Sequence, residues 1–239
     1  MHAGIMKKRE MMEQHKKGAA LFREFILGGQ DGLVNVLGII LGLAIATHDA
    51  KIVIIAGLAA AFAESISMGA VAFTSTRAME DYYSSEEARE KYEMKHYPEV
   101  EKSEIYDIYR QKGFKGKLLG DIVRHITSNK KRWLGIMMKE ELNLTKELLS
   151  PVKASLIVLV SALVGSFIPL TPYFFLTIQN ATLISLIISS LTLFAVGFYK
   201  AKKTLGRKLG RSGLEMMIIG MLSALVGYAI GSIFKVKVV

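Results

Sequence analysis

Long apolar stretches alternate with charged blocks along the 239 residues of the chain. A helix needs about 20 mostly apolar residues to cross the hydrocarbon core of a bilayer. Five stretches reach that length, at residues 25–47, 52–74, 152–170, 174–199 and 213–234. Because backbone amides in lipid must be hydrogen-bonded within their own segment, each stretch is predicted to be a helix. The pattern therefore predicts an all-α membrane protein with five transmembrane helices.

One long polar stretch interrupts this pattern between the second and third apolar segments. Its apolar spacing and turn residues predict three helices, from Ser84 to before Pro98, from Glu99 to Gln111, and from Lys117 towards Leu149. The start at Ser84 is inferred from a capping-box pattern, Ser-Ser-Glu-Glu. The chain is thus expected to divide into an N-terminal cytoplasmic segment with helices 1 and 2 (1–74), a cytoplasmic helical domain (75–150), and helices 3 to 5 (151–239).

Composition narrows the class of protein further. The chain has no cysteine, which excludes disulfide-stapled scaffolds and thiolate metal sites. The formal net charge is +10, and 51% of the residues are hydrophobic. That hydrophobic content is too high for a disordered chain. A cleaved signal peptide at the first apolar stretch is the alternative to a first membrane helix, but Arg23, Glu24 and Asp31 would not suit its apolar region.

The basic residues set the expected orientation, because Lys and Arg gather in two short segments. These precede the first apolar stretch and link the fourth to the fifth: Lys7, Lys8, Arg9, Lys16, Lys17 and Arg23, then Lys200, Lys202, Lys203, Arg207, Lys208 and Arg211. The positive-inside rule places the N-terminus, residues 75–150 and the second basic link in the cytoplasm. Anionic lipid head groups are then a simpler partner for this charge than nucleic acid.

Acidic residues in the polar stretch recur at helical spacing, and two methionines accompany them. They are Glu90 and Glu93, Glu101 and Glu104, and then Met137, Met138 and Glu141. Like charges three residues apart repel on a helix, and a bound cation would offset that repulsion. Carboxylate oxygen with thioether sulfur suits a divalent ion such as Fe²⁺ better than Ca²⁺ or Mg²⁺. The alternative is a solvated acidic helix with two methionines in the core.

Ionisable residues also occur within the apolar stretches, where they commonly mark an ion or proton pathway. Asp31 lies in the first stretch, and Glu64 lies one helical turn before Met68 in the second. The alternative is that Asp31 sits at the membrane interface and Glu64 makes a structural hydrogen bond. In the first stretch, Gly38 and Gly42 form a small-xxx-small pattern that predicts close helix packing.

Residues 25–34 (FILGGQDGLV) and 65–70 (SISMGA), with the acidic insert and five-helix layout, resemble the vacuolar iron transporter family. The resemblance implies a homodimer that encloses a translocation path matching Asp31 and Met68. It also implies a cytoplasmic metal-binding domain whose ligands match Glu90, Glu93, Glu101, Glu104, Met137, Met138 and Glu141. One departure is that some members carry a glutamate about two turns before the methionine. Residues 58–61 contain none, so either Glu64 takes over that role from a shifted position or the proton coupling differs in detail.

The resulting hypothesis is a proton-coupled transporter, not an enzyme, that exports Fe²⁺ from the cytoplasm. Mn²⁺, Co²⁺ or Zn²⁺ are alternative cargoes, and no prosthetic group is expected. A prokaryotic plasma membrane is favoured by the short N-terminal extension, and a vacuolar membrane is the alternative. One rival is a membrane-bound di-iron ferroxidase, suggested by the single Glu-x-x-His at Glu93 and His96. The other is a protein that binds metal without transporting it.

Overall fold

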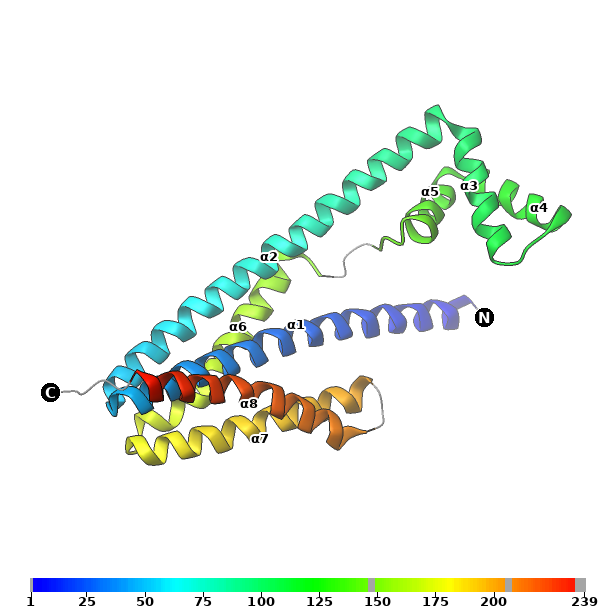
Figure 1. The fold of residues 1–239 in the computed structure, drawn as a ribbon. Helices are drawn as coiled ribbons and strands as arrows, with labels where there is room; N and C mark the ends of the chain where they lie inside the picture. The colour runs from blue at the N-terminus through cyan, green and yellow to red at the C-terminus, as the bar shows by residue number, and fades with distance from the viewer. Residues whose placement is uncertain (1, 146–148, 205–207, 235–239) are drawn as a thin grey trace. The chain divides into compact units, whose positions relative to one another are not determined.

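The computed structural model describes residues 2–145, 149–204 and 208–234, with the backbone alone for 2–17 and 204. The described part is built from helices and short connections (Figure 1). Its elements are α1 (His2–Thr47), α2 (Ala50–His96), α3 (Pro98–Gln111), α4 (Gly116–Thr127), α5 (Lys130–Ile136), the π-helical turn η1 (Met137–Glu141), α6 (Pro151–Leu170), the 3-10 turn η2 (Thr171–Phe174), α7 (Ile178–Thr204) and α8 (Leu209–Ile233).

Five of these helices are long and apolar enough to cross a membrane, namely α1, α2, α6, α7 and α8. This confirms the predicted all-α class with five transmembrane helices and short helices between the second and third. The expected basic residues Lys7, Lys8, Arg9, Lys16 and Lys17 have side chains outside the described part, and Arg207 lies outside it altogether.

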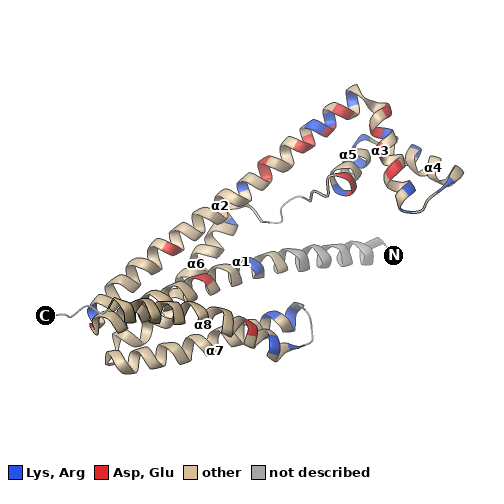
Figure 2. Ribbon diagram, in the orientation of Figure 1, with Lys and Arg blue, Asp and Glu red and all other residues tan. Residues whose placement is uncertain are grey.

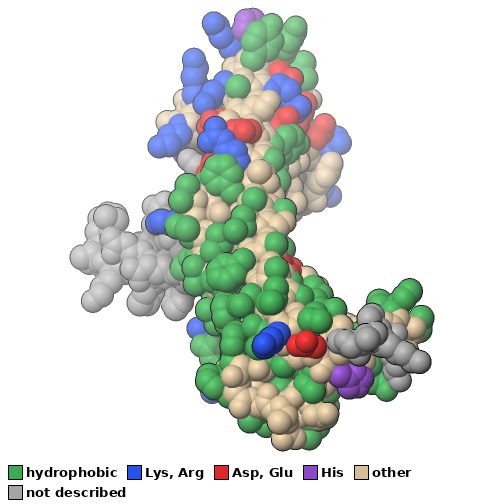
Figure 3. Space-filling view, turned by 90° about the vertical axis from the view of Figure 1, so that its left-hand side faces the viewer, with side chains coloured by type: hydrophobic (Ala, Val, Ile, Leu, Met, Phe, Trp, Pro, Cys, Tyr) green, Lys and Arg blue, Asp and Glu red, His purple; other side chains and the backbone are tan. Residues whose placement is uncertain are grey.

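The chain forms two compact units. We call residues 1–74 with 151–239 the membrane unit, and residues 75–150 the polar lobe. Charged residues are frequent in the second half of α2 and in α3, whereas the ribbons of α6, α7 and α8 are largely uncharged between their ends (Figure 2). Hydrophobic side chains cover much of the visible surface of the membrane unit (Figure 3), as lipid contact requires.

In the membrane unit, α1 packs against α6 on one side and against α8 on another. Gly38 and Gly42 lie directly against the backbone of Gly227 and Gly231 in α8, where no side-chain carbon would fit. The predicted close packing through the Gly38 and Gly42 pattern is therefore confirmed. Small residues allow such backbone approach between membrane helices.

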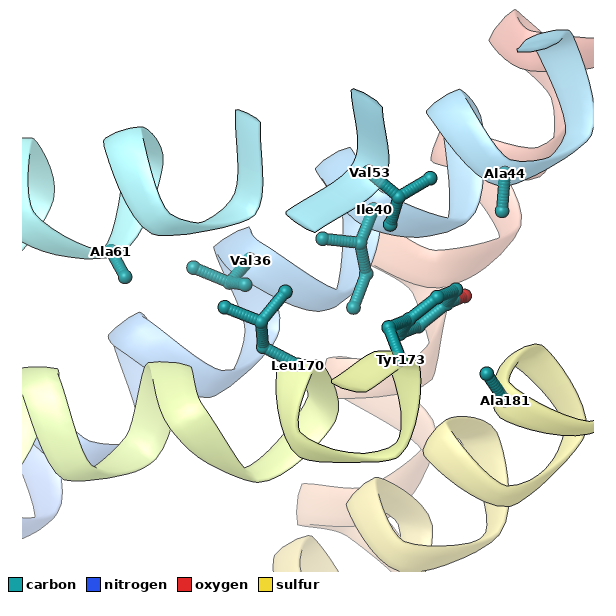
Figure 4. Packing of buried hydrophobic residues seen from close by; sticks show 8 residues of the cluster. All are labelled: Val36, Ile40, Ala44, Val53, Ala61, Leu170, Tyr173 and Ala181. Carbon is teal, nitrogen blue, oxygen red and sulfur yellow. The ribbon is translucent and has the colours of Figure 1, made fainter. Parts of the chain in front are cut away.

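A cluster of buried apolar side chains packs the helices together at one end of the membrane unit (Figure 4). It draws on α1, α2, α6, η2 and α7, through Val36, Ile40, Ala44, Val53, Ala61, Leu170, Tyr173 and Ala181. The Tyr173 hydroxyl is satisfied by a 3.0 Å hydrogen bond with the Thr182 hydroxyl. This cluster holds together the parts of α1 and α2 that lie next to Asp31 and Glu64.

The predicted helix start at Ser84 is wrong, because α2 continues without a break from Ala50 to His96. The Ser84 hydroxyl donates to the Glu80 carbonyl at 2.9 Å, one turn back along the helix, and so does not cap a new one. No glycine or proline occurs between Gly69 and Pro98 to end the helix. The capping-box pattern therefore lies inside a helix.

The third predicted lobe helix is divided. After α4 ends, the Asn129 side chain accepts from the Arg132 amide at 3.0 Å and caps the separate helix α5. The π-helical turn η1 follows, and Asn143 adopts a left-handed conformation (φ 52°) beyond it. Residues 146–148 of the expected helix lie outside the described part. The division bends the chain so that η1 packs back against α3.

Candidate metal centre and membrane carboxylates

The sharp turn between α2 and α3 brings their acidic faces together. Pro98 begins α3, and the Tyr97 amide bonds to the Glu93 carbonyl at 2.7 Å, so the chain reverses with almost no loop. One carboxylate oxygen each from Glu90, Glu93 and Glu101 then lies within 4.8 Å of the other two. Three of the predicted ligands therefore converge at one place in the polar lobe.

Two of these carboxylates are buried and incompletely satisfied. Glu90 is 1% exposed and Glu101 is 3% exposed. Among the described residues, neither Oε2 atom has a hydrogen-bond partner. An unpaired oxygen of a buried carboxylate raises the free energy of the folded state unless a cation or donor meets it. The arrangement is therefore chemically suited to a cation with oxygen ligands.

Mutual repulsion extends this cluster to two more glutamates. Burial raises the pKa of Glu101 to about 8, and the neighbouring carboxylates, led by Glu104, add to the rise. Burial, followed by repulsion from Glu93, also raises the pKa of Glu104. Partial burial of its carboxyl group, followed by repulsion from Glu104 and others, raises the pKa of Glu141 to about 7. All five predicted glutamates thus interact with one another.

The predicted methionines lie in the π-helical turn η1, a feature often found at functional sites. Met137 and Met138 are both buried. Met137 packs with Ile105, Ile126 and Trp133 in the core of the lobe. Its side chain therefore has the packing role of the alternative interpretation, and the contact of either sulfur with a metal stays a prediction.

A second polar cluster lies between α1 and α2 in the membrane unit. The Asn35 amide donates to the Glu64 carboxylate, and Asp31 is close enough to Glu64 for their carboxyl groups to interact. Asp31 also lines a pocket of about 190 Å³ with Gln30 and α8. Met68 is half-buried one turn beyond Glu64 on α2. The structure therefore brings Asp31 and Glu64 together across two helices.

Comparison with known proteins now identifies the family. Residues 22–232 match the model of the VIT family. The chain belongs to the VIT family. It is 31% identical to vacuolar iron transporter 1 of Tulipa gesneriana over 223 residues, covering 92% of this chain and 90% of the relative. It is 30% identical to vacuolar iron transporter 1 of Arabidopsis thaliana (93% and 90% covered) and 31% identical to the vacuolar iron transporter of Plasmodium falciparum (93% and 85% covered).

In this VIT family member, sequence reasoning missed two residues beside the lobe cluster. The Arg89 guanidinium lies 2.8 Å from Glu86 and 3.8 Å from both Glu90 and Glu93. Glu86 lies one turn before Glu90, so the i, i+4, i+7 spacing of the three glutamates was a signal for it. The positive charge of Arg89 would repel a metal ion bound at this cluster and so would lower its affinity.

Asn35 was also missed, although it lies one helical turn after Asp31 on the same face of α1. The Glu-x-x-His of the ferroxidase alternative is not assembled as that alternative requires. The exposed His96 ring stacks on Tyr92 with centroids 4.0 Å apart, and its Nδ1 bonds to the Tyr92 carbonyl at 2.8 Å. In the part of the chain described, the group able to hold a metal contains glutamates alone.

Proposed function

We propose that this VIT family member is a proton-coupled transporter that exports Fe²⁺ from the cytoplasm, with Mn²⁺, Co²⁺ or Zn²⁺ as further possible cargoes. The relatives named above are iron transporters. The observation that carries the proposal is the convergence of Glu90, Glu93 and Glu101, with two buried oxygens left without partners.

The polar lobe would collect the ion from the cytoplasm. Its proposed ligands are the five glutamates and two methionines of the cluster: Glu90, Glu93, Glu101, Glu104, Met137, Met138 and Glu141. Thioether ligands favour transition-metal ions over Ca²⁺ and Mg²⁺, which prefer oxygen alone. The ion is the cargo of the protein, so the site has to release it as well as bind it.

The membrane unit would carry the ion past Asp31, Glu64 and Met68. Asn35 is exposed on the single chain, and its bond to Glu64 lies at the surface. Polar groups at membrane depth raise the free energy unless protein or water covers them. A second copy of the chain packed over α1 and α2 would cover them, which supports a homodimer with the path at its interface.

Proton coupling would follow from competition between the metal and protons for the same carboxylate oxygens. On an acidic far side, protonation would weaken binding and favour release. The methionine sulfur of Met68 does not protonate, so it would keep contact with the ion at any pH. Release would then depend on the carboxylates of Asp31 and Glu64.

We also propose which membrane contains the protein and which side faces the cytoplasm. The relatives are vacuolar transporters by name, whereas for this chain a prokaryotic plasma membrane is our preferred location. The N-terminus and residues 75–150 would face the cytoplasm, because the basic link around Lys200 and Arg211 would lie on the same side. Export would then remove excess metal from the cell.

The test is Fe²⁺ flux into sealed proteoliposomes with an imposed pH gradient. The Asp31→Ala variant should lose flux while the lobe still binds Fe²⁺, and the control Asp49→Ala, in the turn between α1 and α2, should keep it. Flux at the parent rate in Asp31→Ala would remove Asp31 from the path. Competition by Mn²⁺, Co²⁺ and Zn²⁺ in the same vesicles would establish the cargo.

The two rival functions give different results in the same preparation. A ferroxidase would consume oxygen faster than Fe²⁺ does in the same buffer without protein, whereas a transporter would not add to that background rate. A protein that only binds metal would take up Fe²⁺ in the lobe but would give no flux across the vesicle membrane.

A further inference from the structure

The polar lobe contains a cavity of about 530 Å³ that the proposed transport does not use. It lies between the last turns of α2 and the helix α5. The residues around it are Glu87, Lys91, Met94, Lys95, Lys130, Lys131, Trp133 and Leu134. Pockets that bind small molecules commonly have volumes of about 300–1,000 Å³. The cavity is therefore large enough for a small organic ion.

The charge around the cavity is strongly positive. Four lysines and one glutamate line it, which leaves a net charge of +3. Lys91 pairs with that glutamate, Glu87, at 3.2 Å. Within the described ranges, Lys95, Lys130 and Lys131 form no ion pair with an acidic side chain. Three like charges around one hollow repel, and an anion between them would relieve that repulsion.

The rest of the wall is apolar, and it includes one face of the tryptophan Trp133. Met94, Leu134 and Trp133 supply the apolar surface. Trp133 is buried, and its indole Nε1 has no hydrogen-bond partner in the described part of the chain. A buried N–H without an acceptor raises the free energy of the folded state. Because Nε1 itself is buried away from solvent, the cavity offers a ligand the indole ring surface and the lysines around it.

The end of α2 therefore has two faces of opposite chemistry. Glu90 and Glu93 lie on the face that meets Glu101 of α3, whereas Glu87, Lys91 and Lys95 border the cavity. These two sets are offset by about one residue along the helix, which turns them roughly 100° apart. An anion in the cavity would thus lie on a different face of α2 from the acidic cluster.

We propose that this cavity binds a small, multiply charged oxyanion that carries carboxylate or phosphate groups. Lysine binds such groups as a compact charge with three donors. The apolar wall suits a compact organic body better than a fully hydrated inorganic ion such as chloride. The inference concerns anion binding alone and does not depend on transport.

Trp133 provides a direct measurement, because it is the single tryptophan of the chain. The full-length protein is placed in nanodiscs of zwitterionic lipid without metal. Citrate and pyrophosphate are then titrated at constant ionic strength, with sodium chloride as the blank. Each anion should give a saturable change in tryptophan fluorescence, and the two should compete for one site.

Two sets of substitutions locate the site. The triple variant Lys95→Ala, Lys130→Ala, Lys131→Ala should weaken binding by about tenfold or more. The control Lys115→Ala, Lys117→Ala removes exposed lysines of the same lobe that do not line the cavity, and should leave binding unchanged. If the triple variant fails to fold, Lys95→Gln alone should still weaken binding measurably, with the circular dichroism spectrum as the check on folding.

The proposal is overturned if no saturable response occurs, or if the cavity and control variants respond alike. A response only to added vesicles that contain anionic lipid would also overturn it, because the binding partner would then be a membrane surface. A response to pyrophosphate but not to citrate would contradict the role of the apolar wall and would overturn the proposal of an organic oxyanion.

Discussion

The two acidic clusters of this protein differ in how completely a single chain builds them. The lobe cluster gathers Glu90, Glu93 and Glu101 from two consecutive helices and buries two of the three almost fully. The membrane cluster joins Asn35 and Glu64 across 29 residues of sequence and leaves them at the surface of the chain. A local turn is therefore sufficient for the first cluster, whereas the second depends on helix packing and, as proposed, on a second chain.

We expect the largest loss of Fe²⁺ transport from a substitution in the membrane cluster. Asn35→Leu removes the donor that orients Glu64, and loss of such an orienting partner commonly lowers activity by about 10–100-fold. Fe²⁺ flux in proteoliposomes should fall by that factor, while Fe²⁺ binding to the lobe should not change. Ile39→Leu, one turn further along the exposed face of α1, is the control. Equal flux in both variants would show that the Asn35 bond is not needed.

A somewhat smaller effect is expected in the lobe. Glu101→Gln removes a buried carboxyl group that can ionise to meet the metal, and Fe²⁺ affinity measured anaerobically should fall by about tenfold. Flux should then drop at low Fe²⁺ and recover at high Fe²⁺, because the membrane path is intact. Glu99→Gln on the same helix is the control, since Glu99 is exposed and paired with Lys102. Unchanged affinity in Glu101→Gln would separate this residue from the metal centre.

The stability of the lobe should fall with rising pH when no metal is present, and the stabilisation by added metal should increase with rising pH. The folded lobe holds the pKa of Glu101 near 8 and of Glu141 near 7, against 4.5 for the free side chain. Without metal, the stability that these groups contribute is full below about pH 4.5 and is lost as the pH rises through about 7 to 8. Metal needs the deprotonated carboxylates, so its affinity should rise over the same range.

Thermal unfolding followed by Trp133 fluorescence measures both trends. Between about pH 5 and pH 8, the metal-free lobe should lose roughly 5 °C in Tm, and Fe²⁺ should restore it mainly at the higher pH. The Glu101→Gln variant should show a flatter profile. A metal-free Tm that rises with pH would contradict the raised pKa values.

The smallest effect is expected at Arg89. Its guanidinium lies close to three glutamates, so Arg89→Gln removes a positive charge that opposes a bound cation. Because Arg89 is half-exposed and its charge is screened, Fe²⁺ should bind only about threefold more tightly. The control is Arg124→Gln, where an exposed arginine of the same lobe pairs with Asp121. Weaker binding in Arg89→Gln would indicate that Arg89 organises the glutamates.

Sequence alone predicted the features that depend on local pattern. The length of each apolar run predicted the five spans, because the thickness of the bilayer fixes the number of residues needed. The Pro98 boundary and the end of α3 before Gly113 (φ 95°) were correct for the same local reasons. The start at Ser84 was wrong because a serine followed by glutamates is equally compatible with a helix interior.

The parts that sequence could not predict depend on contacts between distant residues. The bond between Asn35 and Glu64 requires the packing of two helices, and no local pattern encodes it. The burial of Glu90 and Glu101 depends on how α2 and α3 meet, and the division after Thr127 depends on the Asn129 cap. The metal role of the lobe and the path through the membrane stay predictions until flux and binding are measured.

The glycine contacts of α1 also bear on how the membrane unit can move. Backbone lies against backbone where α1 meets α6 and α8, at positions such as Gly28, Gly32 and Gly38. At Gly57 of α2, by contrast, an added side-chain carbon would first meet side-chain atoms of Leu170 and Ile40, which can change rotamer. During the proposed transport we therefore expect α1 to stay fixed against α6 and α8, and the part of α2 around Gly57 to be the part that can shift. In a chain without native cysteines, a pair of introduced spin labels on these two helices would measure that displacement cleanly.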